Sequence, residues 1–247
     1  MPEYIFGSGT VVGVRTDVSG QQPAFFGTLQ DITLDFSRKI ESLVGQYMSP
    51  VAFAGGELTI TGKAKMGRFQ AAFMNNMFWG QTLTSNAGIE MAVAEAGTPS
   101  AGSYQVQNHS TFGQDLGVFY AATGAQLTPV STAPAQGQYE VSPTGSYTFN
   151  TADNNQALLF YYNYTVSTEQ QLSITNQLMG PVTSFSLFLK ESFTYFGTPK
   201  NFNLKLNFCV SEKLTLGFTN TKFSIPELDF MAGADQGNNI GTISLTD

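Results

Sequence analysis

The sequence predicts a mainly β protein with one flanking α-helix and a small β-sandwich inserted into the chain. Three observations support this class. Several segments alternate apolar and polar residues with the two-residue period of half-buried strands. One segment alone, residues 68–79, combines strong helix formers with a helix-stop glycine. A central block, residues 86–168, has no Lys or Arg and is divided by frequent turn signals.

Composition excludes several functions. The 247 residues carry 11 basic and 18 acidic side chains, and the 12% that are charged compare with roughly 25% in an ordinary soluble domain. The 21 Phe and 10 Tyr are too many for a disordered chain. The net charge of −7 leaves no basic footprint for binding nucleic acid through its phosphates. Weakly charged surfaces associate, so we expect a self-associating protein.

The first predicted strand covers residues 31–36, where Asp31, Thr33 and Asp35 alternate with apolar side chains. A weaker alternation predicts a second strand at 57–65. Half-buried antiparallel strands of this kind form a sheet with one wet face. The three polar side chains are therefore candidates for that face.

Between these strands lies a connection of about twenty residues, 37–56, which we interpret as a long loop. Structureless loops of that length are usually functional or disordered. This one has no linker composition, and its apolar residues predict contact with a partner. A hairpin packed on its own domain is the alternative. The candidate contact residues are Arg38, Ile40, Leu43, Val44, Tyr47, Met48, Val51 and Phe53.

The helix predicted at 68–79 ends before Gly80 and is apolar almost all the way round. Such a helix is buried on most sides. Because a single sheet covers only one side, we expect a neighbouring subunit to cover the other; a two-sided domain core is the alternative. The residues concerned are Phe69, Phe73, Met74, Met77 and Phe78.

The C-terminal third predicts strands at 182–196 and 201–210, followed by a turn at residues 211–212 and another strand through Leu214, Leu216 and Phe218. The clearest alternation is in 201–210, where five apolar residues face one way. Its polar face consists of Asn201, Asn203, Lys205 and Asn207.

The central block, 86–168, is interpreted as an inserted domain that separates two parts of one core domain, 1–85 and 169–247. The ends of an inserted domain lie close together. Turns at this spacing predict a small immunoglobulin-like β-sandwich. Its expected strands are 118–121, 138–141, 147–149 and 158–166.

The residues that carry chemistry are sparse. The lone histidine has no nucleophile at hydrolase spacing, and the lone Cys209 is expected to pack in a strand. We therefore predict no enzyme activity, no cofactor and no metal site. Tyr161, Tyr162 and Tyr164 fit a platform for stacking sugars, although strand tyrosines of a sandwich explain them as well. No export signal or membrane segment is expected.

Several segments resemble the tail tube (major tail) proteins of tailed bacteriophages, and the resemblance covers most of the chain. Residues 137–141 and 147–150 are similar to small β-domains of phage virion proteins. The segments that resemble tail tube proteins are Gly27–Phe36, Leu43–Tyr47, Pro50–Ala52, Ile60–Lys65, Val210–Leu214 and Phe223–Phe230.

The resemblance implies a subunit that forms rings, commonly of six copies, whose inner strands join into one barrel. The long loop would stack one ring on the next, the helix would lie between sheet and neighbour, and the insert would decorate the outside. Double-stranded DNA would pass through the lumen without specific binding. The polar residues of 31–35 and 201–207 named above are the candidates to face that lumen.

The implied partners are further copies of the chain, a tape-measure protein and tail-end proteins, in a virion tail assembled in the bacterial cytoplasm. Contractile and non-contractile tails and a related secretion tube stay open. The alternative function is a virion or cell-surface module that binds carbohydrate or a receptor through the Tyr-rich insert.

Overall fold

The computed structural model describes residues 9–20, 22–68, 70–180, 182–195 and 198–246. Strands account for 56% of the residues and helices for 6%, which confirms a mainly β protein. The chain divides into two compact units. The first unit combines Met1–Leu83 with Leu172–Asp247, and the second is Thr84–Gln171, within which the predicted insert lies.

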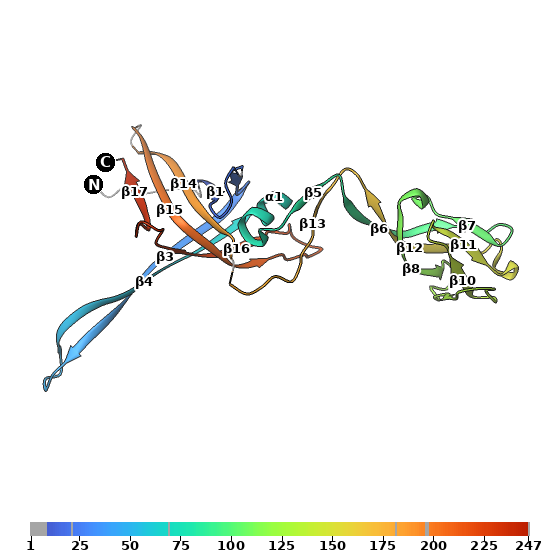
Figure 1. The fold of residues 1–247 in the computed structure, drawn as a ribbon, viewed down its shortest axis with the longest axis horizontal. Coiled ribbons are helices and arrows are strands. Elements are labelled where there is room, and N and C mark those ends of the chain that lie inside the picture. Colours follow the sequence, from blue (N-terminus) through green and yellow to red (C-terminus); the bar gives the residue numbers. More distant parts are fainter. Residues whose placement is uncertain (1–8, 21, 69, 181, 196–197, 247) are drawn as a thin grey trace. The chain divides into compact units, whose positions relative to one another are not determined.

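The first unit is built on one eight-stranded antiparallel sheet (Figure 1). Its order is β2-β1-β14-β15-β16-β4-β3, and β17 pairs with β15 beyond the end of β16. The sheet is open over the described residues, with β3 at one edge and β2 and β1 at the other. The strands are β1 (Thr10–Arg15), β2 (Ala24–Phe25), β3 (Leu29–Val44), β4 (Pro50–Met66), β14 (Ser184–Tyr195), β15 (Thr198–Thr215), β16 (Glu227–Gly233) and β17 (Gly241–Leu245).

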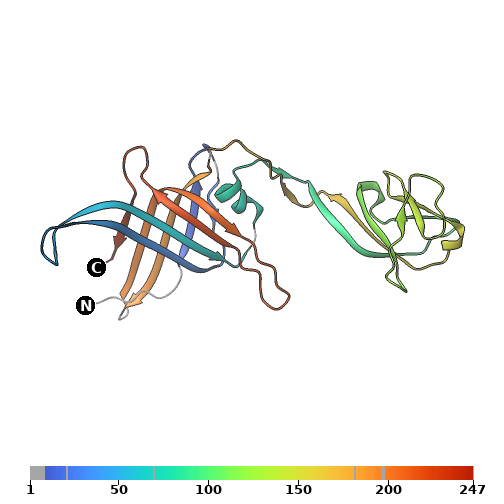
Figure 2. The same ribbon diagram turned by 90° about the horizontal axis from the view of Figure 1, so that it is seen from below.

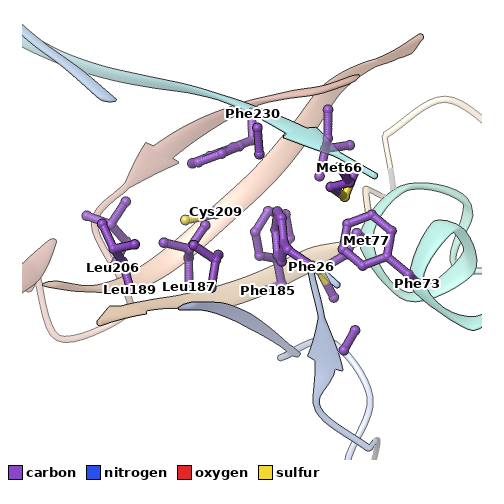
Figure 3. Packing of buried hydrophobic residues seen from close by; sticks show 14 of the residues in the cluster. Phe26, Met66, Phe73, Met77, Phe185, Leu187, Leu189, Leu206, Cys209 and Phe230 are labelled. Carbon is purple, nitrogen blue, oxygen red and sulfur yellow. The ribbon is translucent and has the colours of Figure 1, made fainter. Parts of the chain in front are cut away.

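One face of this sheet carries the hydrophobic core of the first unit (Figure 3). The ring of Phe230 packs over Gly62 on the neighbouring strand, where a Cβ atom would lie only 2.2 Å from the ring. Burying each large apolar side chain contributes about 1.5–3 kcal/mol. Buried members of this core include Phe26, Met66, Phe73, Met77, Phe185, Leu187, Leu206, Cys209, Leu228 and Phe230.

The predicted helix is shorter than expected and changes type. It begins as α1 (Ala71–Met74) and continues as the π-helical turn η1 (Asn75–Trp79). It ends at Gly80 as predicted, because this residue has φ 65°, a left-handed conformation that glycine adopts without strain. Phe69 lies outside the described residues.

Asn75, one of the few polar residues of this helix, is buried. Its side-chain Nδ2 donates to the carbonyl oxygen of Gln81, and its Oδ1 accepts from the Gln81 N–H. The amide thus satisfies two backbone groups just after the helix, which is why a polar side chain is accommodated there.

The turn predicted at residues 211–212 is absent, and β15 runs through it without a break. The pairing with β14 shifts at a bulge: Leu187 pairs with Leu206, whereas Phe185 pairs with Cys209. The shift turns Cys209 into the core, so Phe208 is only half-buried. Burial raises the pKa of the Cys209 thiol to about 12.

The long loop predicted at 37–56 is wrong, because the segment forms a hairpin. Strands β3 and β4 pair from Leu29 opposite Met66 to Val44 opposite Pro50, while the pairing of β4 with β16 ends at Ile60. The hairpin therefore continues beyond the sheet as a two-stranded ribbon (Figures 1 and 2). We call residues 36–58 the arm; all of them are exposed.

The second unit contains two sheets that contribute to one core. The three-stranded sheet has the order β6-β12-β8, and the four-stranded sheet β7-β11-β10-β9. The chain enters this unit through β5 (Leu83–Ser85) and leaves through β13 (Gln170–Leu172), which pair with each other. The other elements are β6 (Gly88–Gly97), β7 (Ser103–Gln105), η2 (His109–Thr111), β8 (Phe112–Tyr120), β9 (Thr128–Pro129), β10 (Gln138–Val141), β11 (Ser146–Phe149), η3 (Thr151–Asp153) and β12 (Leu158–Val166).

Candidate assembly surfaces

The face of the large sheet opposite the core, which we call the polar face, holds most of the candidate lumen residues. On β3 the neighbouring residues Ile32 and Leu34 pack against the core. Because side chains alternate along a strand, Asp31, Thr33 and Asp35 point to the polar face. The pairing of β3 with β4 sets these three residues opposite Lys65, Lys63 and Thr61.

The charges of this region offset one another. The Lys63 Nζ donates to Glu227 Oε1 at 2.8 Å and lies 3.5 Å from Asp229 Oδ1. The Lys65 Nζ lies 3.6 Å from Asp31 Oδ2. The hydrogen bond from Lys63 lowers the pKa of Glu227 and, in return, raises the pKa of Lys63. These pairs are partly open to water, so they neutralise charge more than they stabilise the fold.

The β15 side of the polar face is less charged. Lys205 pairs with Phe188 on β14, and its Nζ lies 5.5 Å from the centre of that ring. Asn203 is exposed, and Asn201 accepts a hydrogen bond from Ser192 Oγ. Asn207 differs from this set, because it is half-buried near the β15 bulge and its Nδ2 donates to Asp235 Oδ2. The Asn207 side chain is therefore engaged in a hydrogen bond within its own subunit.

The arm carries the largest uncovered apolar side chains that the sequence predicted for a contact. Tyr47 is 72% exposed, Met48 is 104% exposed and Phe53 is 70% exposed. Its outer end, residues 43–56, contains no charged side chain. The hairpin is not packed on its own domain. The other predicted contact residues, Arg38, Ile40, Leu43, Val44 and Val51, are exposed as well.

The helix needs no neighbour to cover Phe73 and Met77, contrary to the sequence-based expectation. Both are buried in the core of their own unit. Phe73 packs edge to face against Phe26, with ring centres 4.8 Å apart, and Gly13 on β1 leaves room for the Met77 sulfur. The alternative expectation, a core of the same domain that covers both sides of the helix, is therefore correct for Phe73 and Met77. Met74 and Phe78 are partly buried against the same cluster.

A second exposed apolar surface was missed from the sequence. The connection between β15 and β16, residues 216–226, exposes Phe218 by 77% and Phe223 by 96%. The alternation of Leu214, Leu216 and Phe218 is typical of a strand, so a strand was predicted from the sequence where this loop begins. The exposed aromatic residues, together with Gly217, Asn220 and Pro226, are the sequence signals that point to it.

The three tyrosines considered for stacking sugars do not form one platform. Tyr162 is completely buried, and its hydroxyl donates to Glu95 and accepts from the Asn108 N–H. The Tyr164 hydroxyl donates to Glu90, and the Tyr161 ring packs edge to face on Phe119. Strand packing therefore explains Tyr162.

Carboxylates of the second unit accept hydrogen bonds from tyrosines and not from cations. The unit has no Lys or Arg, and tyrosine hydroxyls donate to four of its carboxylates instead. Tyr120, for example, donates at 2.6 Å to the buried Asp153. The pairs are Tyr139 and Tyr147 with Asp115, Tyr120 with Asp153, Tyr104 and Tyr162 with Glu95, and Tyr164 with Glu90.

These pairs predict that the second unit loses stability in alkali. Burial, followed by the adjacent carboxylates, raises the pKa of Tyr120 and of Tyr162 from 10.0 to about 12. The unfolded chain loses these protons near pH 10 and the folded chain near pH 12, so the stabilisation is complete below pH 10 and is lost between these values. Absorbance of tyrosinate followed together with circular dichroism should show late ionisation coupled to unfolding. Ionisation of all tyrosines near pH 10 without unfolding would contradict the prediction.

Comparison with known protein families finds no match, and comparison with curated proteins finds no similar sequence. Among the described residues, no group of three His, Cys, Asp or Glu side chains is placed to hold a metal ion. Within the same part of the chain, no helix has the length and apolar character needed to cross a membrane.

Proposed function

We propose that the chain is a structural subunit that self-assembles into stacked rings, six copies to a ring, and that these rings form the tail tube of a tailed bacteriophage. The observation that carries the proposal is the arm, a β-hairpin whose apolar, uncharged end has no cover within its own subunit. Exposed apolar surface of this kind marks an interaction site. The resemblance of the sequence to tail tube proteins assigns the same segment to ring stacking.

The open sheet supports ring formation. Edge strands present unpaired backbone groups, and a protein must cover them or pair them. In our proposal the β3 edge of one subunit meets the β2–β1 edge of the next, a head-to-tail contact that closes into a ring. Closure continues the sheet into a barrel shared by all subunits.

The polar face then forms the channel wall. Amides, hydroxyls and mutually paired charges such as Lys63 with Glu227 line most of it, and Lys205 lies over the Phe188 ring. A wall of this kind gives passing DNA few free cations for counterion-releasing phosphate contacts. The core and helix lie behind this wall. The inserted unit, as an immunoglobulin-like sandwich, decorates the outside of the tube, and tape-measure and tail-end proteins are the further partners.

Electron microscopy of the purified protein across a concentration series tests the proposal, with sedimentation velocity run on the same samples. We expect hollow tubes or stacked rings of uniform bore that lengthen with concentration. A monomer or a closed small oligomer that never stacks over the whole series would contradict the proposal.

A further inference from the structure

The loop at residues 216–226 lies at the opposite end of the sheet from the arm. Strand β4 begins at Pro50, at the tip of the arm, and ends at Met66. Strand β16 begins at Glu227, which pairs with Lys65 near that far end. The loop that precedes Glu227 therefore leaves the sheet beyond the end of β4. At about 3.3 Å per residue, the tip and this end are about 50 Å apart.

A second loop leaves the sheet at the same end. Residues 173–180 and 182–183 lead into β14, whose Ser184 pairs with Val210. Leu178 is 88% exposed and Met179 is 100% exposed. We call residues 173–180 and 216–226 the docking loops.

The arm and the docking loops match in chemistry. The outer end of the arm, residues 43–56, has no charge, and the docking loops have one, on Lys222. Each surface is rich in exposed apolar side chains, including Tyr47 and Met48 on the arm and Phe223 on the loops. Contact between them buries apolar groups without desolvating an unpaired acid.

Within one subunit the two surfaces cannot meet, because the length of β4 separates them. A second copy of the chain supplies the complementary surface to each. A head-to-tail contact between different surfaces can be repeated without limit, because every added copy presents a new arm and new loops. Because the arm and the loops lie at opposite ends of the same strands, repetition proceeds along the sheet.

We propose that the arm of one subunit docks on the docking loops of a subunit in the adjacent ring. This inference rests on the proposed ring-forming function and adds the partner surface of the arm.

The test uses two variants of the full chain, each purified separately. The arm variant carries Tyr47→Asp and Met48→Asp, and the loop variant carries Met179→Asp and Phe223→Asp. All four side chains are exposed, so the charges do not enter the core. Each variant alone is expected to form single rings that do not stack.

A mixture of the two preformed rings distinguishes this contact from other arrangements. The arms of the loop variant can dock on the intact loops of the arm variant. The two-ring stack that results has a mutated arm at one end and mutated loops at the other, so it cannot grow. Microscopy and sedimentation should show two-ring stacks and nothing longer.

A matched control places two aspartates on the second unit, as Ile89→Asp and Val93→Asp, where both side chains are exposed on β6. This control should stack like the unmodified protein. The docking inference is overturned if the loop variant also stacks normally, or if the mixture stays as single rings. An unmodified protein that never forms rings overturns the proposed function as well.

Discussion

Replacing residues 40–53 with a short Gly/Ser linker is expected to abolish ring stacking completely while the subunit remains folded. The replaced residues contribute nothing to the buried core, since every one of them is exposed. The pairing of β4 with β16 begins only at Ile60, so the sheet keeps its hydrogen bonds. Loss of the arm therefore removes an intermolecular contact and leaves the intramolecular ones in place.

Microscopy would score the stacking, and circular dichroism with thermal unfolding would score the fold. A matched control exchanges the exposed ion pair of Lys39 and Glu41, which are 2.8 Å apart, as Lys39→Glu with Glu41→Lys. This change keeps the arm and its net charge, so tubes should form. Tubes built by the linker variant, or its failure to fold, would contradict the role assigned to the arm.

The arm also shows where sequence reasoning fails for this fold. Periodicity reports a strand only when one face is buried and the other is wet. The arm is exposed on both faces, and apolar residues such as Leu43 and Val44 follow each other directly. Gly55 and Gly56 add a loop signature. The exposed apolar residues of the arm were nevertheless recognisable as candidates for a contact, because apolar side chains in an apparent loop are informative without knowledge of its backbone.

The sheet within the first unit was more predictable, because its core selects for alternation. Strand β14 was predicted to within about two residues, and Asp31, Thr33 and Asp35 were placed on the correct face. The bulge near Cys209 was not predictable, since it depends on the pairing with β14 and not on the residues of β15 alone. The burial of Asn75 likewise follows from its hydrogen bonds to Gln81.

The candidate lumen residues were predictable as far as alternation decides the face. The match between the arm and the docking loops was not, because it requires the register of β4 and β16. Nothing in the sequence tells how far residues 216–226 lie from the arm. The tyrosines of the second unit were ambiguous for a similar reason, since the carboxylates that bind their hydroxyls are distant in sequence.

Replacing Asp115 with alanine is expected to destabilise the second unit by about 2–6 kcal/mol. Its carboxylate accepts hydrogen bonds from the Tyr139 hydroxyl at 2.5 Å and the Tyr147 hydroxyl at 2.8 Å. Both tyrosines are almost fully buried, at 1% and 0% exposure. Alanine would leave two buried hydroxyl groups without an acceptor, and each such group costs about 1–3 kcal/mol.

Urea unfolding of the full chain separates the two units by their chromophores. The single tryptophan, Trp79, lies in η1 and reports the first unit, whereas near-ultraviolet circular dichroism includes the tyrosines of the second. In Asp115→Ala, only the unfolding transition followed by the tyrosine signal should move to lower urea concentration. Adding Tyr139→Phe and Tyr147→Phe to this variant removes the orphaned hydroxyls. The triple variant should recover most of the lost stability, because deleting both partners of a hydrogen bond costs far less than deleting one. A triple variant no more stable than Asp115→Ala would show that the carboxylate acts through something other than these two bonds.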